Sequence, residues 1–167
     1  MEFYERLKLD DLFYEADAKI KQQNYADAMQ TLEAILAEAP EYGKAYNHLA
    51  WLYDTKYRDL GKAAEYYEKC LFYEPEYAPV YMNYAAVLST MNRWKELEEL
   101  LRKALDVPGV DKATVYNEYG IMYELLGNYD EAVKHYKDAI RCTLAIENVE
   151  TYQTSVNRCN RKKELLA

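Results

Sequence analysis

Apolar residues recur along this chain with the period of an α-helix. In a clear example they follow the i, i+3, i+4, i+7 spacing of one helix face, at Tyr46, Leu49, Ala50 and Tyr53. Similar stripes follow one another along most of the chain, and no segment alternates apolar and polar residues for long enough to indicate a strand. The pattern therefore predicts an all-α protein.

The stripes come in pairs, and the pair returns at a step of 34 or 35 residues. The first apolar anchors of the four copies are Leu12, Tyr46, Tyr81 and Tyr116. A turn signal separates the two stripes of each pair, and a proline closes the first three copies. Because one helix pair cannot bury its apolar faces alone, a repeat of this length predicts a stack of helix hairpins.

The residues within the copies carry a family pattern. The second copy reads Y-N-H-L-A-W-L-Y at residues 46–53, followed by Ala63, Tyr67 and Pro75. It resembles the tetratricopeptide repeat, whose pattern is W-x2-L-G-x2-Y, then A-x3-F, then P. The third and fourth copies are similar, and the first is degenerate, as suits a terminal repeat.

This resemblance implies a right-handed α-solenoid of helix-turn-helix repeats in a single domain spanning residues 1–167. The repeats are expected at about residues 9–42, 43–77, 78–112 and 113–146. Residues 1–8 fit either an extension of the first helix or a separate cap, and the sequence does not decide between them.

The fourth copy is not closed by a proline, and a further apolar stripe follows it at Val149, Tyr152, Val156 and Cys159. The stripe predicts a final amphipathic helix at about residues 147–165. Such a helix would cap the last repeat and present a polar outer face. The alternative is that the helix pairs with a second subunit, which would make the protein a homo-oligomer.

Charge and hydropathy exclude several classes of partner. The net charge is −8, and the body of the chain is acidic while its last residues are basic. An acidic surface repels phosphate backbones, so no nucleic-acid partner is expected. No apolar run approaches the ~18 residues of a membrane span, and no secretory leader pattern is present, so we expect a cytoplasmic protein without a membrane partner.

Motifs for catalysis, metal binding and cofactor binding are absent from the sequence. The two histidines, His48 and His135, lie in different repeats, and the three cysteines have no C-x-x-C spacing. Phosphate-binding glycine loops and nucleophile elbows are missing as well. We therefore expect neither an enzyme nor a cofactor or metal site.

Tetratricopeptide proteins hold peptides or partner helices on one side of the first helix of each repeat, and the resemblance places the candidate binding residues there. They stand one, five and eight positions beyond each anchor, about 100° around from the packing stripe. The twelve residues are Phe13, Asp17, Ile20, Asn47, Trp51, Asp54, Met82, Ala86, Ser89, Asn117, Ile121 and Glu124. Three of them are carboxylates and none is Lys or Arg, so the predicted groove is mildly acidic.

The composition of this groove predicts an adaptor that binds a protein or peptide segment with apolar and basic residues. Trp51 and Met82 are the expected anchors, Asp17, Asp54 and Glu124 the expected charge partners, and Asn47 and Asn117 possible ligands of an extended backbone. Asn47 and Asn117 fit a solvated role equally well, and Trp51 could instead fill space between adjacent first helices.

Alternative functions of another class stay open. A chaperone-tail receptor is disfavoured, because Phe13 and Asp17 stand where that class places cations or Asn to bind a carboxylate. A homo-oligomeric scaffold and an accessory subunit of a larger complex are both compatible with the sequence.

Overall fold

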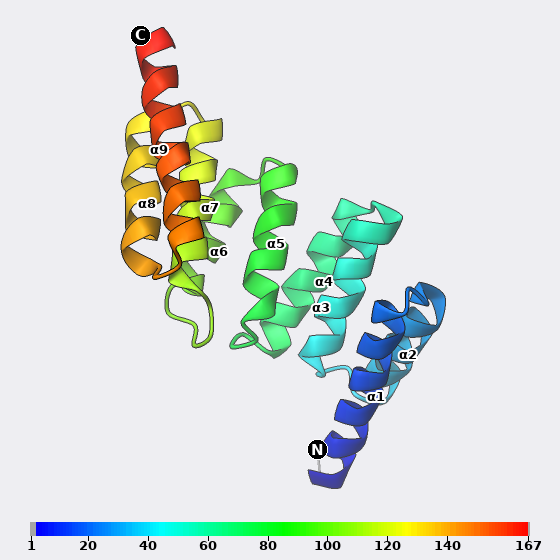
Figure 1. Cartoon of the computed structure of the whole chain (residues 1–167). Coiled ribbons are helices and arrows are strands. Elements are labelled where there is room, and N and C mark those ends of the chain that lie inside the picture. Colours follow the sequence, from blue (N-terminus) through cyan, green and yellow to red (C-terminus); the bar gives the residue numbers. More distant parts are fainter. Residues whose placement is uncertain (1–2, 167) are drawn as a thin grey trace. The chain divides into compact units, whose positions relative to one another are not determined.

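The computed structural model describes residues 3–166, and every regular element in that range is a helix (Figure 1). The chain forms two compact units, Met1–Val87 and Leu88–Ala167. The elements of the N-terminal unit are α1 (Phe3–Lys21), α2 (Tyr25–Glu38), α3 (Gly43–Leu52), the π-helical η1 (Tyr53–Tyr57), α4 (Leu60–Tyr73) and most of α5 (Pro79–Thr90). Those of the C-terminal unit are α6 (Trp94–Ala104), α7 (Lys112–Leu125), α8 (Tyr129–Cys142) and α9 (Ile146–Leu166). The prediction of an all-α fold is confirmed.

The turns between paired helices use left-handed backbone. Gln23, Arg58, Asn92 and Gly127 have φ values of 63°, 58°, 56° and 74°. The helices α4 and α8 that follow two of these turns begin after the capping residues Asp59 and Asn128. The side chains of these residues accept hydrogen bonds from backbone N–H groups in the first turn of each helix. At their far ends, α2 and α4 stop shortly before a proline, since the residue preceding proline disfavours the helical region.

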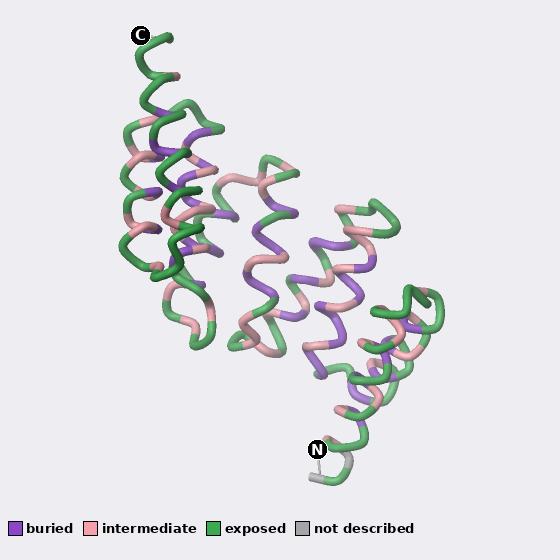
Figure 2. Tube along the Cα trace, in the orientation of Figure 1, coloured by how far each residue is buried: buried purple, intermediate pink, exposed green. Residues whose placement is uncertain are grey.

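The core of the N-terminal unit forms where α1, α2 and α3 meet. Leu32, Ile35 and Leu52 have no exposed surface, and Leu9 and Phe13 of α1 are buried beside them. Buried residues recur among exposed ones along α1 and α2, whereas α3 contains no exposed residue (Figure 2). The helical apolar stripes of the sequence are thus the faces that pack.

Residues 3–8 continue α1, which begins at Phe3, so this part of the chain takes the first of the two forms that the sequence allowed. Arg6 contributes to that extension by donating to Glu74 at 3.1 Å, and its guanidinium lies 4.5 Å from the Tyr42 ring centroid. Residues 1–2 lie outside the described range.

The second hairpin holds one residue more than the others between its anchor and the small residue of its second helix. That segment runs from Tyr46 to Ala63, against Tyr116 to Ala132 in the fourth copy. The structure accommodates the extra residue in η1, where the helix widens to i→i+5 hydrogen bonding. The N–H of Arg58 then closes the turn on the Tyr53 carbonyl.

In the C-terminal unit, α9 packs along α8 (Figure 1), and its Arg158 side chain reaches Glu124 of α7. Tyr152, Val156 and Cys159 are 7%, 3% and 0% exposed and belong to the clusters around Ala132 and Ala139. Most of the apolar stripe is therefore used within this unit. A contact with a second subunit through the same residues would have to displace α9 from its own hairpin.

Candidate functional site

A cavity of about 480 Å³ opens on the N-terminal unit, and we call it the Trp51 pocket. Four of its lining residues are predicted groove residues: Asp17 and Ile20 of α1, and Asn47 and Trp51 of α3. The others are Lys21, His48, Tyr77, Pro79 and Asn83. The volume lies within the ~300–1,000 Å³ usual for ligand pockets.

Two amides form part of the polar wall of this pocket. The Asn83 Nδ2 donates to the Asn47 Oδ1 at 3.2 Å, and Asn47 is only 3% exposed. No other side-chain hydrogen bond of either residue occurs within the described range, so the Asn47 Nδ2 donor and the Asn83 Oδ1 acceptor remain available. A donor and an acceptor side by side match the alternating groups of an extended peptide backbone.

A carboxylate with two basic neighbours forms another part of the wall. The Lys21 Nζ lies 2.6 Å and the His48 Nε2 lies 3.5 Å from Asp17 carboxylate oxygens. The hydrogen bond from Lys21 holds the pKa of Asp17 below its usual value. Burial lowers the pKa of His48, and the neighbouring Asp17 opposes that effect. At neutral pH the pocket therefore carries an ionised Asp17 and a mostly neutral His48.

Trp51 is the large apolar side chain at this site and is partly exposed. It packs against the core of the N-terminal unit on one side and lines the cavity as well. The Lys56 Nζ lies 5.2 Å from the Trp51 ring centroid. Asp54, which follows Trp51 closely in the sequence, is partly exposed and forms no ion pair with any described residue.

The remaining predicted residues of the N-terminal unit and of α5 do not line this cavity. Phe13 is 7% exposed and belongs to the core, with its ring against that of His48 at a centroid distance of 4.5 Å. Met82 and Ser89 are partly exposed on α5, and Ala86 is exposed. Phe13 therefore supports the pocket from behind.

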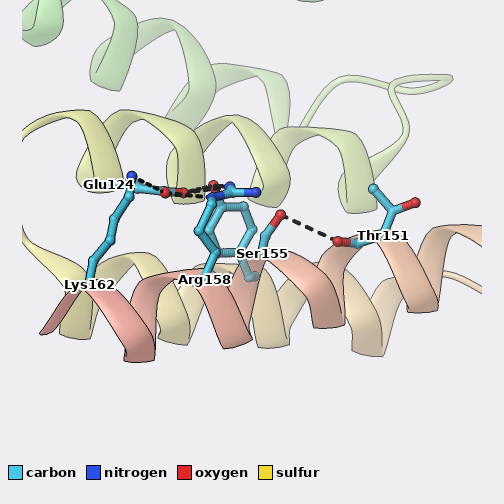
Figure 3. A network of polar contacts seen from close by, with 6 residues as sticks. Glu124, Thr151, Ser155, Arg158 and Lys162 are labelled. Atoms are coloured by element: carbon cyan, nitrogen blue, oxygen red, sulfur yellow. Dashed lines mark hydrogen bonds and ion pairs between the residues drawn. The ribbon is translucent and has the colours of Figure 1, made fainter. Parts of the chain in front are cut away.

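Glu124 of α7 is engaged within the chain (Figure 3). Arg158 donates to its two carboxylate oxygens at 2.7 Å each, and Lys162 of the same helix donates at 2.8 Å. The Tyr136 hydroxyl donates a further hydrogen bond at 2.8 Å. These donors, Arg158 foremost, hold the pKa of Glu124 far below its usual value. Ile121 also packs on the cluster that holds Val156, whereas Asn117 is partly exposed.

Sequence reasoning missed two kinds of residue. His48 and Asn83 each stand two positions beyond an anchor, next to the predicted groove position one residue beyond it. A prediction that covered a wider arc of the helix surface would include both residues. The partners of Glu124, Arg158 and Lys162, were visible only as a basic C-terminal end, and their spacing of four residues on one helix face was the available signal.

The repeated helix hairpins define an all-α protein of the α-solenoid class. Models of the tetratricopeptide repeat match residues 14–79 and 76–145, and the chain belongs to the tetratricopeptide repeat family. The predicted fold class and family are thus confirmed. No curated protein sequence matches the chain.

Solved structures of other tetratricopeptide proteins share the fold. PilF of Pseudomonas aeruginosa is 19% identical with a TM-score of 0.81, covering 96% of this chain and 71% of that one. MamA is 18% identical with a TM-score of 0.69, covering 93% of each chain. A thermophilic protein of Thermus thermophilus is 19% identical with a TM-score of 0.63, covering 89% of this chain and 81% of that one. At these identities the likeness concerns the fold alone.

Two kinds of feature are missing from the described residues. Over residues 3–166 no helix has the length and apolar character to cross a bilayer. The same range contains no group of three or more His, Cys, Asp or Glu side chains arranged to hold a metal ion.

Proposed function

We propose that this protein is an interaction module that binds a segment of another protein in the Trp51 pocket. The proposal is supported by its membership of a family of protein-interaction repeats. The observation that carries it is a partly exposed tryptophan in a cavity whose wall also holds a free amide donor and a free amide acceptor. Such a combination of an aromatic anchor and backbone-binding groups is typical of peptide sites.

Each part of the pocket has a role in this proposal. An apolar side chain of the partner enters between Ile20 and Trp51, where burial of its surface supplies most of the binding free energy. The Asn47 and Asn83 amides bind the partner backbone on either side of that side chain. Asp54 attracts a Lys or Arg of the partner, because it has no cationic partner within the described chain.

Glu124 and Ile121 are not part of the proposed binding surface, since α9 already occupies both. Phe13 acts through the packing of His48 rather than by contact. Met82 and Ala86 on α5 remain candidates for contact with a longer partner segment, and the binding roles of Ser89 and Asn117 stay predictions.

Selection from a random peptide library on the full chain tests this function. The Trp51→Ala variant serves for counter-selection, so that only peptides needing the pocket are retained. We expect enriched peptides to carry a large apolar residue close to Lys or Arg. Trp51→Ala should weaken their binding by about 2 kcal/mol, or about 30-fold in Kd by calorimetry, without loss of helicity.

A matched control is Phe72→Ala, which removes an aromatic side chain that is 79% exposed on α4. It should leave peptide affinity unchanged. Failure to enrich any peptide, or equal affinities for wild type and Trp51→Ala, would exclude the Trp51 pocket as the binding site.

The proposal includes a cytoplasmic adaptor role. Cys70, Cys142 and Cys159 are all free thiols, which suits a reducing compartment. Fractionation of cells that express the tagged protein tests this part. We expect the protein in the cytoplasmic fraction, and its detection in the membrane or secreted fractions would contradict the role.

A further inference from the structure

The ammonium group of Lys56 lies between two aromatic rings beside the Trp51 pocket. Its Nζ is 4.6 Å from the Tyr25 ring centroid and 5.2 Å from the Trp51 ring centroid. No ion pair joins Lys56 to a carboxylate in the described part of the chain. The negative faces of the two rings are therefore what attracts this cation.

The π-helical turn is what brings Lys56 to this position. In a regular α-helix, a residue five positions after Trp51 would lie about 140° around the axis from it. In the wider turn of η1 each residue turns through a smaller angle, which brings Lys56 closer to the side of Trp51. The one-residue insertion in the second hairpin thus creates the contact between Lys56 and Trp51.

This arrangement is particular to the second repeat. At the register position of Trp51 the other copies have Asp17, Ala86 and Ile121, none of which offers an aromatic face. Tyr25 supplies the second ring from the first residue of α2. The aromatic pair therefore joins a residue of the first repeat to one of the second, and no later repeat offers an aromatic residue at the Trp51 position.

We propose that the Tyr25 and Trp51 rings form a cation-binding subsite, which Lys56 occupies in the free protein and a Lys or Arg side chain of the partner occupies in the complex. The inference rests on the proposed function of the Trp51 pocket and specifies the chemistry of its ligand. The protein's own ammonium lies within cation–π distance of both rings. Lys56 acts as an internal competitor that lowers affinity for basic ligands.

Charge around the subsite favours a cationic occupant over an anionic one. Asp54 stands two residues before Lys56 without an ion-pair partner among the described residues, and Asp17 lines the adjoining pocket. The chain as a whole carries a net charge of −8. A cationic ligand beside the displaced Lys56 would be attracted by these carboxylates, whereas an anion would be repelled by them.

A small cation tests the subsite without need of a selected peptide. Trp94→Phe leaves Trp51 as the single tryptophan of the chain. In that background, tetramethylammonium chloride is titrated against sodium chloride at equal ionic strength while Trp51 fluorescence is recorded. We expect Lys56→Gln to bind tetramethylammonium about threefold or more tightly than the parent.

Two control variants isolate the cause. Lys137→Gln changes the net charge by the same amount at an exposed residue of α8 and should bind as the parent does. Lys56→Met removes the charge but keeps an apolar stem, and should reproduce Lys56→Gln. Lys56 is exposed, so neither replacement leaves a cavity. Equal tetramethylammonium binding by the parent, Lys56→Gln and Lys56→Met overturns the proposal.

Peptides separate this inference from the proposed function. A selected peptide with Lys should bind Lys56→Gln about threefold or more tightly than wild type, while its Lys→Met counterpart should not distinguish the two proteins. Loss of binding in Trp51→Ala with no gain in Lys56→Gln would leave the binding function standing and reject the cation subsite. Tighter tetramethylammonium binding without any peptide ligand would support the subsite and reject the binding function.

Discussion

Equivalent carboxylates of the two units have opposite surroundings. Asp54 and Glu124 both stand eight residues beyond the anchor of their repeat, and a tyrosine occupies the same site on each following helix, Tyr67 in α4 and Tyr136 in α8. In the C-terminal unit, Tyr136 donates to Glu124 and α9 adds two cations. In the N-terminal unit, the Tyr67 hydroxyl is buried without a hydrogen-bond partner among the described residues, and Asp54 forms no ion pair there.

The difference follows from the helices that come next in the chain. The helix after the fourth hairpin, α9, carries Arg158 and Lys162 four residues apart. The helix after the second hairpin, α5, contains no charged residue. Asp54 is also one methylene shorter than Glu124 and lies in η1, which changes its approach to the following helix. The same position of the repeat therefore holds α9 against α7 through Glu124 in the C-terminal unit, and carries an unpaired negative charge, Asp54, in the N-terminal unit.

Disruption of the α9 contact should have the largest effect on stability. Val156 is 3% exposed in the cluster of Ala132, Tyr136 and Cys159. Val156→Asp would place an unpaired carboxylate there, at a cost of about 3 kcal/mol or more in the free energy of unfolding. Urea denaturation followed by circular dichroism measures it. Asn157→Asp, at the exposed neighbour, is the control, and a cost below about 1 kcal/mol for Val156→Asp would mean that α9 does not pack as described.

The two units also differ in how closely the first helix of the hairpin approaches the tyrosine of the second, because α7 has a glycine, Gly120, beside Tyr136. A Cβ at Gly120 would lie 2.6 Å from the Tyr136 ring, whereas the second repeat has Ala50 at the same register. Gly120→Ala should therefore cost about 2 kcal/mol by overpacking, despite the better helix propensity of alanine. Gly61→Ala in α4 is the control, since its nearest neighbouring atom is 3.5 Å away. It should leave stability unchanged or raise it by about 0.5 kcal/mol, and equal effects at the two glycines would reject the steric explanation.

The ion-paired carboxylate of Glu124 predicts that the stability of the protein depends on pH in the acid range. The pKa of Glu124 lies below its usual 4.5 in the folded protein, so its contribution is complete above about pH 5 and is lost as the pH falls further. Glu124→Gln should cost about 1.5 kcal/mol at pH 7, through weaker hydrogen bonds to Arg158 and Lys162. Its stability should also decline less steeply than that of wild type between about pH 5 and about pH 3.

Urea titrations at several pH values measure both effects. Glu164→Gln, at a side chain that is 68% exposed and paired with Arg161, is the control and should follow the wild-type curve. A Glu124→Gln curve parallel to that of wild type would show that Glu124 titrates with an ordinary pKa.

The success of sequence reasoning differed between local and long-range features. The helices and their turns follow from apolar stripes and turn residues within each repeat, and they were predicted. Asp17, Ile20, Asn47 and Trp51 come to one cavity because their spacing along two first helices is regular. The ion pair of Glu124 is made with Arg158, which follows 34 residues later on α9, and no pattern within one repeat predicts that contact.

The π-helix shows a different limit. The sequence reveals that the second hairpin has one residue more, but an extra residue can enter a turn or widen a helix at similar cost. The contact of Lys56 with Trp51 depends on which of these happens. The chemistry of the candidate subsite was therefore beyond prediction, although both residues were visible.

Asp17 of the N-terminal unit, whose ion-pair partner is exposed, should show the smallest effect on stability and a clear effect on the neighbouring His48. The Lys21 partner of Asp17 is 75% exposed at its side chain, so Asp17→Asn should change the free energy of unfolding by no more than about 0.5 kcal/mol. The Asp17 carboxylate raises the pKa of His48 against the effect of burial, and its removal should lower that pKa further. NMR titration of the two histidine rings measures the shift, with His135 of the other unit as the internal control. An unchanged or higher pKa for His48 would mean that Asp17 does not face the imidazole, and the polar wall of the Trp51 pocket would need a different description.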